Sequence, residues 1–125
     1  PDLSATRFAP ALGVNLAAMT KSATGLYTKD VTVGTGAEVT RGQQVAVRYT
    51  GWLVSGTKID SSDGLEFRFG SADVIRGWTE GMAGMKVGGV RTLVIPPELG
   101  YGYRDNPVIP GGSVLVFRIE VRRVR

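Results

Sequence analysis

The sequence predicts an α+β fold, an antiparallel β-sheet of about five strands wrapped around one short α-helix. Three observations lead to this class. Short segments alternate between apolar and polar residues, as half-buried strands do. One stretch near the middle instead repeats its apolar residues at helical spacing. Glycine occurs 18 times in 125 residues without a period, which indicates many tight turns within one domain rather than a fibrous repeat.

The first 25 residues are expected to form an N-terminal extension, residues 1–25, ahead of the folded domain, residues 26–125. This stretch is rich in Ser, Thr and Ala and contains two prolines. Within it, Asn15 is a candidate cap for a helical turn that would place Leu16 and Met19 on one side. A poorly ordered tether with one docked turn explains the same stretch equally well.

Strand patterns begin at Leu26 and are separated by glycine-containing turns. The expected strands are residues 26–33, 43–54, 65–69, 90–95 and 114–124, with a brief pairing of residues 58–60 before a loop at residues 61–64. The last strand alternates most clearly, with Leu115, Phe117, Ile119 and Val121 inward and Val116, Arg118, Glu120 and Arg122 outward. Such alternation is typical of an antiparallel sheet with one buried face.

The expected helix lies between residues 71 and 85. Its apolar residues at helical spacing are Val74, Ile75, Trp78, Met82 and Met85, and Ser71 is the candidate N-cap. Gly77, Gly81 and Gly84 each lower helix propensity by about 1 kcal/mol relative to alanine. Packing must therefore hold this helix, and its small residues should let it lie close to another surface.

Composition excludes several kinds of chemistry. The chain has no cysteine and no histidine, so it lacks thiolate nucleophiles, Ser-His-Asp groups and the metal sites built on those residues. The loop that begins at Asp60 has Ser71 at the twelfth position, where a calcium loop needs an acid. We therefore expect no metal and no cofactor.

The net charge of +4 raises the question of a nucleic-acid partner. Much of the excess lies in Arg118, Arg122, Arg123 and Arg125, which we interpret as the water-facing side of a strand. We expect no nucleic-acid partner; a basic binder remains a third hypothesis and predicts salt-dependent binding. The sequence has no apolar run long enough to span a membrane.

Four blocks of sequence occur in a fixed order. They are Val47-Arg48-Tyr49-Thr50-Gly51-Trp52-Leu53 leading to Asp60-Ser61-Ser62; Val74-Ile75-Arg76-Gly77-Trp78-Thr79-Glu80-Gly81-Met82; Pro96-Pro97-Glu98-Leu99-Gly100-Tyr101-Gly102; and Ile109-Pro110 with Leu115-Val116-Phe117. Together these blocks resemble the signature of the FKBP-type peptidyl-prolyl cis/trans isomerases, the macrolide-binding rotamases. The resemblance covers residues 26–124, most of the chain.

The resemblance implies an apolar pocket with Trp78 as its floor and Asp60 as a carboxylate at its buried edge, hydrogen-bonded to a tyrosine or to a bound ligand. The implied catalytic residues are Tyr49, Asp60, Phe67, Trp78, Tyr101 and Phe117, and the ligand-binding set adds Ile59, Leu65, Val74, Ile75 and Ile109. The hydroxyl of Tyr101 and the backbone N–H of Ile109 would hold ligand carbonyls. Ile59 and Leu65 stand where relatives carry phenylalanine, which would make one side of the pocket less aromatic and affects macrolide affinity.

The implied reaction is rotation about X-Pro bonds in the service of protein folding, which needs neither nucleophile nor metal. Its partners would be proline-containing polypeptides and the macrolides tacrolimus and rapamycin, bound by a monomer. Residues 8–26 resemble the stretch that precedes this domain in exported bacterial members, which implies the bacterial cell envelope or periplasm, otherwise the cytoplasm. The alternative is a chaperone-like module that binds proline-containing or unfolded segments with little isomerase activity.

Overall fold

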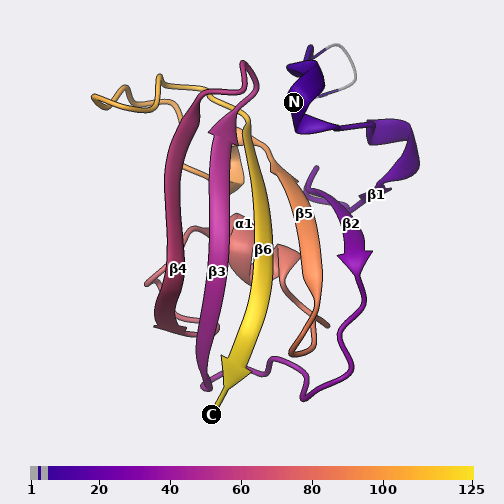
Figure 1. Ribbon diagram of the computed structural model, residues 1–125. Coiled ribbons are helices and arrows are strands. Elements are labelled where there is room, and N and C mark those ends of the chain that lie inside the picture. Colours follow the sequence, from indigo (N-terminus) through magenta and orange to yellow (C-terminus); the bar gives the residue numbers. More distant parts are fainter. Residues whose placement is uncertain (1–2, 4–5) are drawn as a thin grey trace.

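The computed structural model describes residue 3 and residues 6–125. Its six strands form one antiparallel sheet in the order β1-β2-β5-β6-β3-β4, and one short helix, α1, lies against one face (Figure 1). The strands are β1 (Thr20–Lys21), β2 (Tyr27–Thr32), β3 (Gln44–Leu53), β4 (Lys58–Arg68), β5 (Val90–Ile95) and β6 (Leu115–Val124), and α1 is Arg76–Gly81. The predicted α+β class is confirmed, with six strands in place of about five.

The main core lies between α1 and the sheet. Val45 and Val47 of β3, Leu93 of β5 and Ile119 of β6 are completely buried there. The two helix glycines explain how closely α1 approaches: a Cβ at Gly77 would lie 2.6 Å from the Ile95 side chain. A Cβ at Gly81 would lie 2.4 Å from Leu93. Glycine therefore lowers helix propensity here but permits the packing that holds the helix, as expected.

The helix is shorter than the sequence predicts, and Ser71 is not its cap. Ile75 precedes the first turn in an extended conformation, and no side chain caps it. The Ser71 hydroxyl instead donates to the carbonyl of Arg68 at 2.7 Å and accepts the N–H of Asp73 at 3.1 Å. Ser71 thus stabilises the turn after β4. Val74 and Ile75 consequently lie ahead of α1 and not in its first turn, and Ile75 is extended.

The prediction of a loop at residues 61–64 is also wrong, because this stretch belongs to one continuous strand, β4. The strand accommodates its extra residues through two irregularities in its pairing with β3. Ile59 has no partner between the pairs Gly51–Asp60 and Trp52–Lys58, and a second shift follows Ser62. Bulges of this kind bend a strand and re-aim its side chains. Here they lie beside the residue that the sequence placed at the pocket edge, Asp60.

A second, smaller core covers the other face of the sheet. Leu12 of the N-terminal segment packs there with Tyr27, Val94 and Val116. Val116 does point away from α1, as expected, but it is only 1% exposed because this segment covers it. The outward direction of Val116 is confirmed, but the expectation of a sheet with one buried face is wrong at this position. Arg118, two residues further along β6, is exposed as predicted.

The N-terminal segment contains the turn that Asn15 was expected to cap. The Asn15 side-chain oxygen accepts the N–H of Ala17 at 3.2 Å at the start of a short 3-10 helix, Leu16–Ala18. A backbone bond of 2.7 Å from Ala9 N–H to the carbonyl of Val54 ties the segment to the end of β3. The domain boundary at residue 26 stays a prediction. Among the described residues, no helix is both long enough and apolar enough to cross a membrane.

Candidate functional site

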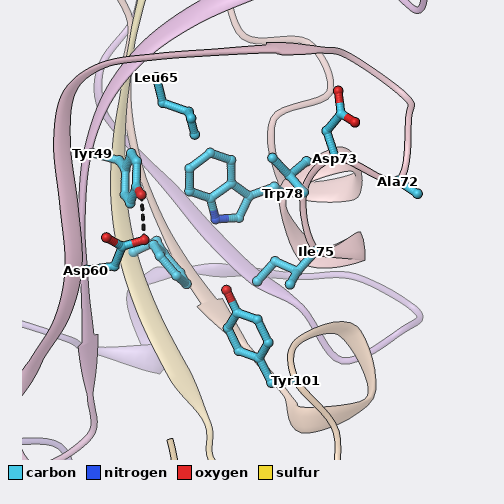
Figure 2. Close-up of a pocket in the computed structure, with 10 residues that line it drawn as sticks. Tyr49, Asp60, Leu65, Ala72, Asp73, Ile75, Trp78 and Tyr101 are labelled. Carbon is cyan, nitrogen blue, oxygen red and sulfur yellow. Dashed lines mark hydrogen bonds between the residues drawn. The ribbon is translucent and has the colours of Figure 1, made fainter. Parts of the chain in front are cut away.

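A cavity of about 390 Å³ lies between the sheet and the segment that leads into α1 (Figure 2). Strands β3, β4 and β6, the segment at residues 72–75, helix α1 and the loop after β5 all contribute to its wall. The lining residues are Tyr49, Asp60, Leu65, Ala72, Asp73, Val74, Ile75, Trp78, Tyr101 and Phe117. The site is thus assembled from segments that are far apart in the sequence.

The floor of the cavity is a cluster of aromatic rings around Trp78, which is 4% exposed. Tyr49 lies 4.8 Å from Trp78 between ring centres, with an interplanar angle of 79°. Phe117 lies at 5.5 Å and 84°, and Phe67 at 5.7 Å and 61°. These edge-to-face contacts are each worth about 0.5–1.5 kcal/mol beyond the area they bury. They give the pocket a rigid apolar floor.

Gly51 on β3 makes room for one of these rings. A Cβ at this position would lie 2.4 Å from Cε1 of Phe117, far inside van der Waals contact. Gly51 pairs directly with Phe117 across the β3–β6 ladder and with Asp60 across the β3–β4 ladder. Glycine at this point of the Tyr49-Thr50-Gly51 motif therefore lets the Phe117 ring pack close to the strand and line the pocket.

The polar edge of the pocket is built around Asp60. The Tyr49 hydroxyl donates to its Oδ2 at 2.6 Å, and the Ser61 N–H donates to its Oδ1 at 2.9 Å (Figure 2). Burial, and then the hydrogen bond to Asp60, raise the pKa of Tyr49 above its ordinary value. Both oxygens of the carboxylate are thus held in place, and the phenol of Tyr49 stays protonated as a donor.

Tyr101 lies across the pocket from this pair, on the loop after β5. This residue is 48% exposed, and Figure 2 shows its hydroxyl pointing into the pocket. Burial, and then the negative charge of Asp60, raise the pKa of Tyr101. The hydroxyl therefore remains a hydrogen-bond donor at neutral pH, available to an acceptor within the cavity.

Most of the residues predicted for the pocket line it, and three do not. Phe67 is buried beside Trp78, and Ile59 lies in the β4 bulge, packed against the core. Ile109 is buried, and its N–H donates to Oδ1 of Asn106 at 2.6 Å. A ligand carbonyl would have to replace Asn106 to reach that N–H.

Two lining residues, Ala72 and Asp73, were missed at the level of sequence. The expected helix included them in its first turn, whereas the chain here forms a turn between β4 and α1 that presents them at the pocket edge (Figure 2). Their position directly before Val74 was the only available signal. Within the described residues, no three His, Cys, Asp or Glu side chains lie close enough together to hold a metal ion.

The fold and the site define the class: a small α+β protein that presents an aromatic pocket with a tyrosine–aspartate pair at its edge. The family model described as FKBP-type peptidyl-prolyl cis-trans isomerase matches residues 36–122. The chain belongs to this family and is therefore a peptidyl-prolyl cis-trans isomerase. This confirms the family resemblance and the class of enzyme that the sequence motifs predicted.

Relatives support the assignment at the level of both sequence and structure. An FK506-binding protein of Neisseria meningitidis serogroup B is 45% identical over 105 residues, which is 80% of this chain and 96% of that protein. The crystal structure of AtFKBP13 superposes with a TM-score of 0.81 at 39% identity, covering 86% of this chain and 98% of that one. FkpA from Escherichia coli gives 0.79 at 41% identity, covering 86% of this chain but only 51% of FkpA.

Proposed function

We propose that the aromatic pocket is where this protein catalyses rotation about X-Pro peptide bonds, and that it thereby assists the folding of proline-containing polypeptides. The observation that carries the proposal is the combination of a rigid aromatic floor around Trp78 with the fixed Tyr49–Asp60 pair at the edge. A proline ring is compact and apolar, and the backbone on either side of it is polar. The aromatic floor suits the apolar proline ring, and the tyrosine–aspartate pair at the edge suits the polar backbone beside it.

The physical basis is the electronic structure of the amide. Rotation crosses a barrier of about 18–20 kcal/mol because it breaks the resonance that keeps the bond planar. The planar form separates charge between oxygen and nitrogen, and the twisted form separates less. An apolar pocket therefore disfavours the planar forms relative to the twisted one. Catalysis consists of binding the twisted form more tightly than either planar form, with no bond made or broken.

The lining residues divide into two roles in this proposal. Trp78, Phe117 and Val74 seat the proline ring, with Tyr49 completing the wall and Phe67 supporting Trp78 from behind. Asp60 and Tyr101 orient the peptide: the carboxylate accepts hydrogen bonds and the hydroxyl donates them. The remaining predicted residues, Ile59, Leu65, Ile75 and Ile109, shape the pocket or its surroundings.

We further propose that the pocket binds tacrolimus and rapamycin. Support comes from the name of the relative at 45% identity, an FK506-binding protein. Leu65 lines the pocket where an aromatic side chain was expected from the resemblance, so the macrolides should bind less tightly than to a pocket with phenylalanine there. We expect a monomer in solution.

A protease-free isomerisation assay on a short X-Pro peptide tests the proposal. Wild type, Asp60→Ala and Asp63→Ala are compared, each with and without tacrolimus. Asp63 is a matched control because it is an exposed acid on the same strand that pairs with Arg48 at 3.2 Å, outside the pocket. We expect wild type and Asp63→Ala to accelerate the reaction, tacrolimus to suppress it, and Asp60→Ala to lose most of it.

A folded wild-type protein that gives no acceleration would contradict the proposal and favour the binding-module hypothesis, with proline-peptide binding as its readout. The first variants to assay for a gain of isomerase activity would then be Ile59→Phe and Leu65→Phe, because phenylalanine is expected from the resemblance at both positions.

The proposed location is the bacterial cell envelope or periplasm. The relative from Neisseria meningitidis and the structure from Escherichia coli support a bacterial source. Fractionation of cells that express the natural gene tests the compartment; recovery in the cytoplasmic fraction alone would overturn it.

A further inference from the structure

The pocket carries a charge opposite to that of the whole protein. The chain has a net charge of +4, yet the charged residues that the described structure places in the cavity lining, Asp60 and Asp73, are both acidic. A substrate segment that enters the pocket therefore meets carboxylates on both sides of Trp78 (Figure 2).

The two carboxylates differ in what already binds them. Both oxygens of Asp60 accept hydrogen bonds, from Tyr49 and from the Ser61 N–H. The Asp73 carboxylate accepts only one long bond of 3.4 Å, from the Arg68 N–H, and forms no ion pair within the described part of the chain. Asp73 thus holds a negative charge that no cation among the described residues pairs with.

The position of Asp73 determines which part of a bound substrate its carboxylate can contact. Figure 2 shows it at the edge of the pocket, with Trp78 between it and Asp60 and with its carboxylate directed away from the floor. It therefore cannot contact a proline ring seated on Trp78. Its carboxylate would instead be available to the residues that flank the proline, so its effect would fall on substrate choice and not on the rotating bond.

Nearby arginines do not cancel this charge. The guanidinium of Arg68 donates to the carbonyl of Gly42 at 2.8 Å, and Arg76 lies 3.9 Å from Glu80. Arg76 and Arg41 line a neighbouring groove, which meets the pocket along the shared segment of residues 72–75. The two sides of this segment therefore differ in sign, with the acidic side toward the pocket.

We propose that Asp73 is a specificity-determining residue that selects proline-containing segments with a lysine or arginine close to the proline. This inference rests on the proposed function, because it concerns which polypeptides the same pocket accepts. Asp73 is exposed, so the ion pair formed with the substrate is solvent-screened and its effect is moderate. The preference for a cationic over an anionic flank should be about threefold to fivefold at low salt.

The test uses peptides with a Phe-Pro core and neutral ends that carry Lys, Gln or Glu, either two residues before or one residue after the proline. The readout is the ratio of kcat/KM for Lys to kcat/KM for Glu at each position. We expect a ratio above one in wild type at one or both positions, falling toward one at about 0.5 M NaCl. It should approach one in Asp73→Asn and drop below one in Asp73→Lys.

Asp63→Asn is the matched control, because it removes an exposed acid outside the pocket and should keep the wild-type ratio. Because the readout is a ratio, a general loss of activity in a variant does not imitate the result. A wild-type ratio at or below one at both positions, or a ratio unchanged in Asp73→Asn, would overturn the inference while leaving the isomerase intact. Failure of wild type to accelerate even the Gln peptide would overturn both.

Discussion

The hydroxyl of Tyr49 donates a 2.6 Å hydrogen bond to Oδ2 of Asp60 and so joins the aromatic wall of the pocket to its acidic edge. The two residues are on adjacent antiparallel strands, β3 and β4, whose pairing is irregular on either side of the bond. The bulge at Ile59 and the shift after Ser62 set how Asp60 sits relative to Tyr49. The bond is therefore a product of strand register, and it depends on details of β4 that a regular strand would not supply.

Replacing Tyr49 with phenylalanine should destabilise the fold by about 1.5–3 kcal/mol, because it removes a hydrogen bond to a charged group at a buried site. The loss should depend on pH. Burial and the bond to Asp60 raise the pKa of Tyr49, so above about pH 10 the unfolded chain releases this proton while the folded chain keeps it. The contribution of Tyr49 to the free energy of unfolding is thus fully present below about pH 10. Above that pH it declines by about 1.4 kcal/mol per pH unit.

Urea denaturation of wild type and Tyr49→Phe between about pH 8 and about pH 11 measures the contribution of Tyr49 to the free energy of unfolding. The difference in unfolding free energy should be constant up to about pH 10 and then shrink. A difference that stays constant throughout would mean that the Tyr49 proton is not held more tightly in the folded state.

Adding a single methyl group at Gly51 should damage the pocket without removing any functional side chain. The Cβ of Gly51→Ala would lie 2.4 Å from the Phe117 ring, so the ring must move. We expect a loss of about 1–3 kcal/mol in stability and a loss of isomerase activity in the protein that remains folded. Gly64→Ala is the control, since nothing lies within 4 Å of its Cβ position. Similar activity in the two variants would show that the Phe117 wall does not contribute.

Arg91 on β5 should contribute more to the stability of the fold than an ordinary surface ion pair does. Its side chain is 15% exposed and donates to the carbonyls of Gly81 and Ala83 at 2.8 Å each, as well as to Asp30 at 2.7 Å. It thereby satisfies the carbonyl end of α1, the helix that carries Trp78. We expect Arg91→Ala to cost about 2–3 kcal/mol in chemical denaturation.

The comparison for Arg91 is Arg76→Ala, which removes an exposed pair on α1 at 3.9 Å. This change should lower the free energy of unfolding by less than about 0.5 kcal/mol. Equal losses in both variants would indicate that the carbonyl contacts of Arg91 add nothing to an ordinary surface ion pair.

Removal of the predicted N-terminal extension tests whether residues 26–125 suffice. This shorter chain lacks the edge strand β1. We expect it to keep β2 to β6, α1 and the pocket, because the main core and the pocket lie on the other face of the sheet from Leu12. It should be less stable by at least about 3 kcal/mol, since Leu12 is lost and Val94 and Val116 become exposed. Thermal unfolding and binding of a hydrophobic dye measure this; equal stability and no added dye binding would show that the covering contributes nothing.

Local patterns predicted much of this structure because much of it depends on neighbours in the chain. Alternation identified β6, and the spacing of Trp78 and Met82 located α1. The predictions failed where tertiary contacts override local preference. The Ser61–Gly64 stretch looks like a loop, yet pairing with β3 holds it as a bulged strand. Ser71 looks like a helix cap, yet it closes the turn after β4 instead.

By itself the sequence determined the α+β class, the segments that pair or coil, the family and most of the side chains that meet in the pocket. These follow from periodicity and motif, which are properties of consecutive residues. Only the tertiary structure decided that Val116 is buried, that Tyr49 is the tyrosine whose hydroxyl Asp60 accepts, and that Asp73, at the pocket edge, forms no ion pair with any residue the structure describes. Burial, register and charge neutralisation depend on distant segments that come together only when the chain has folded, and no local pattern encodes them.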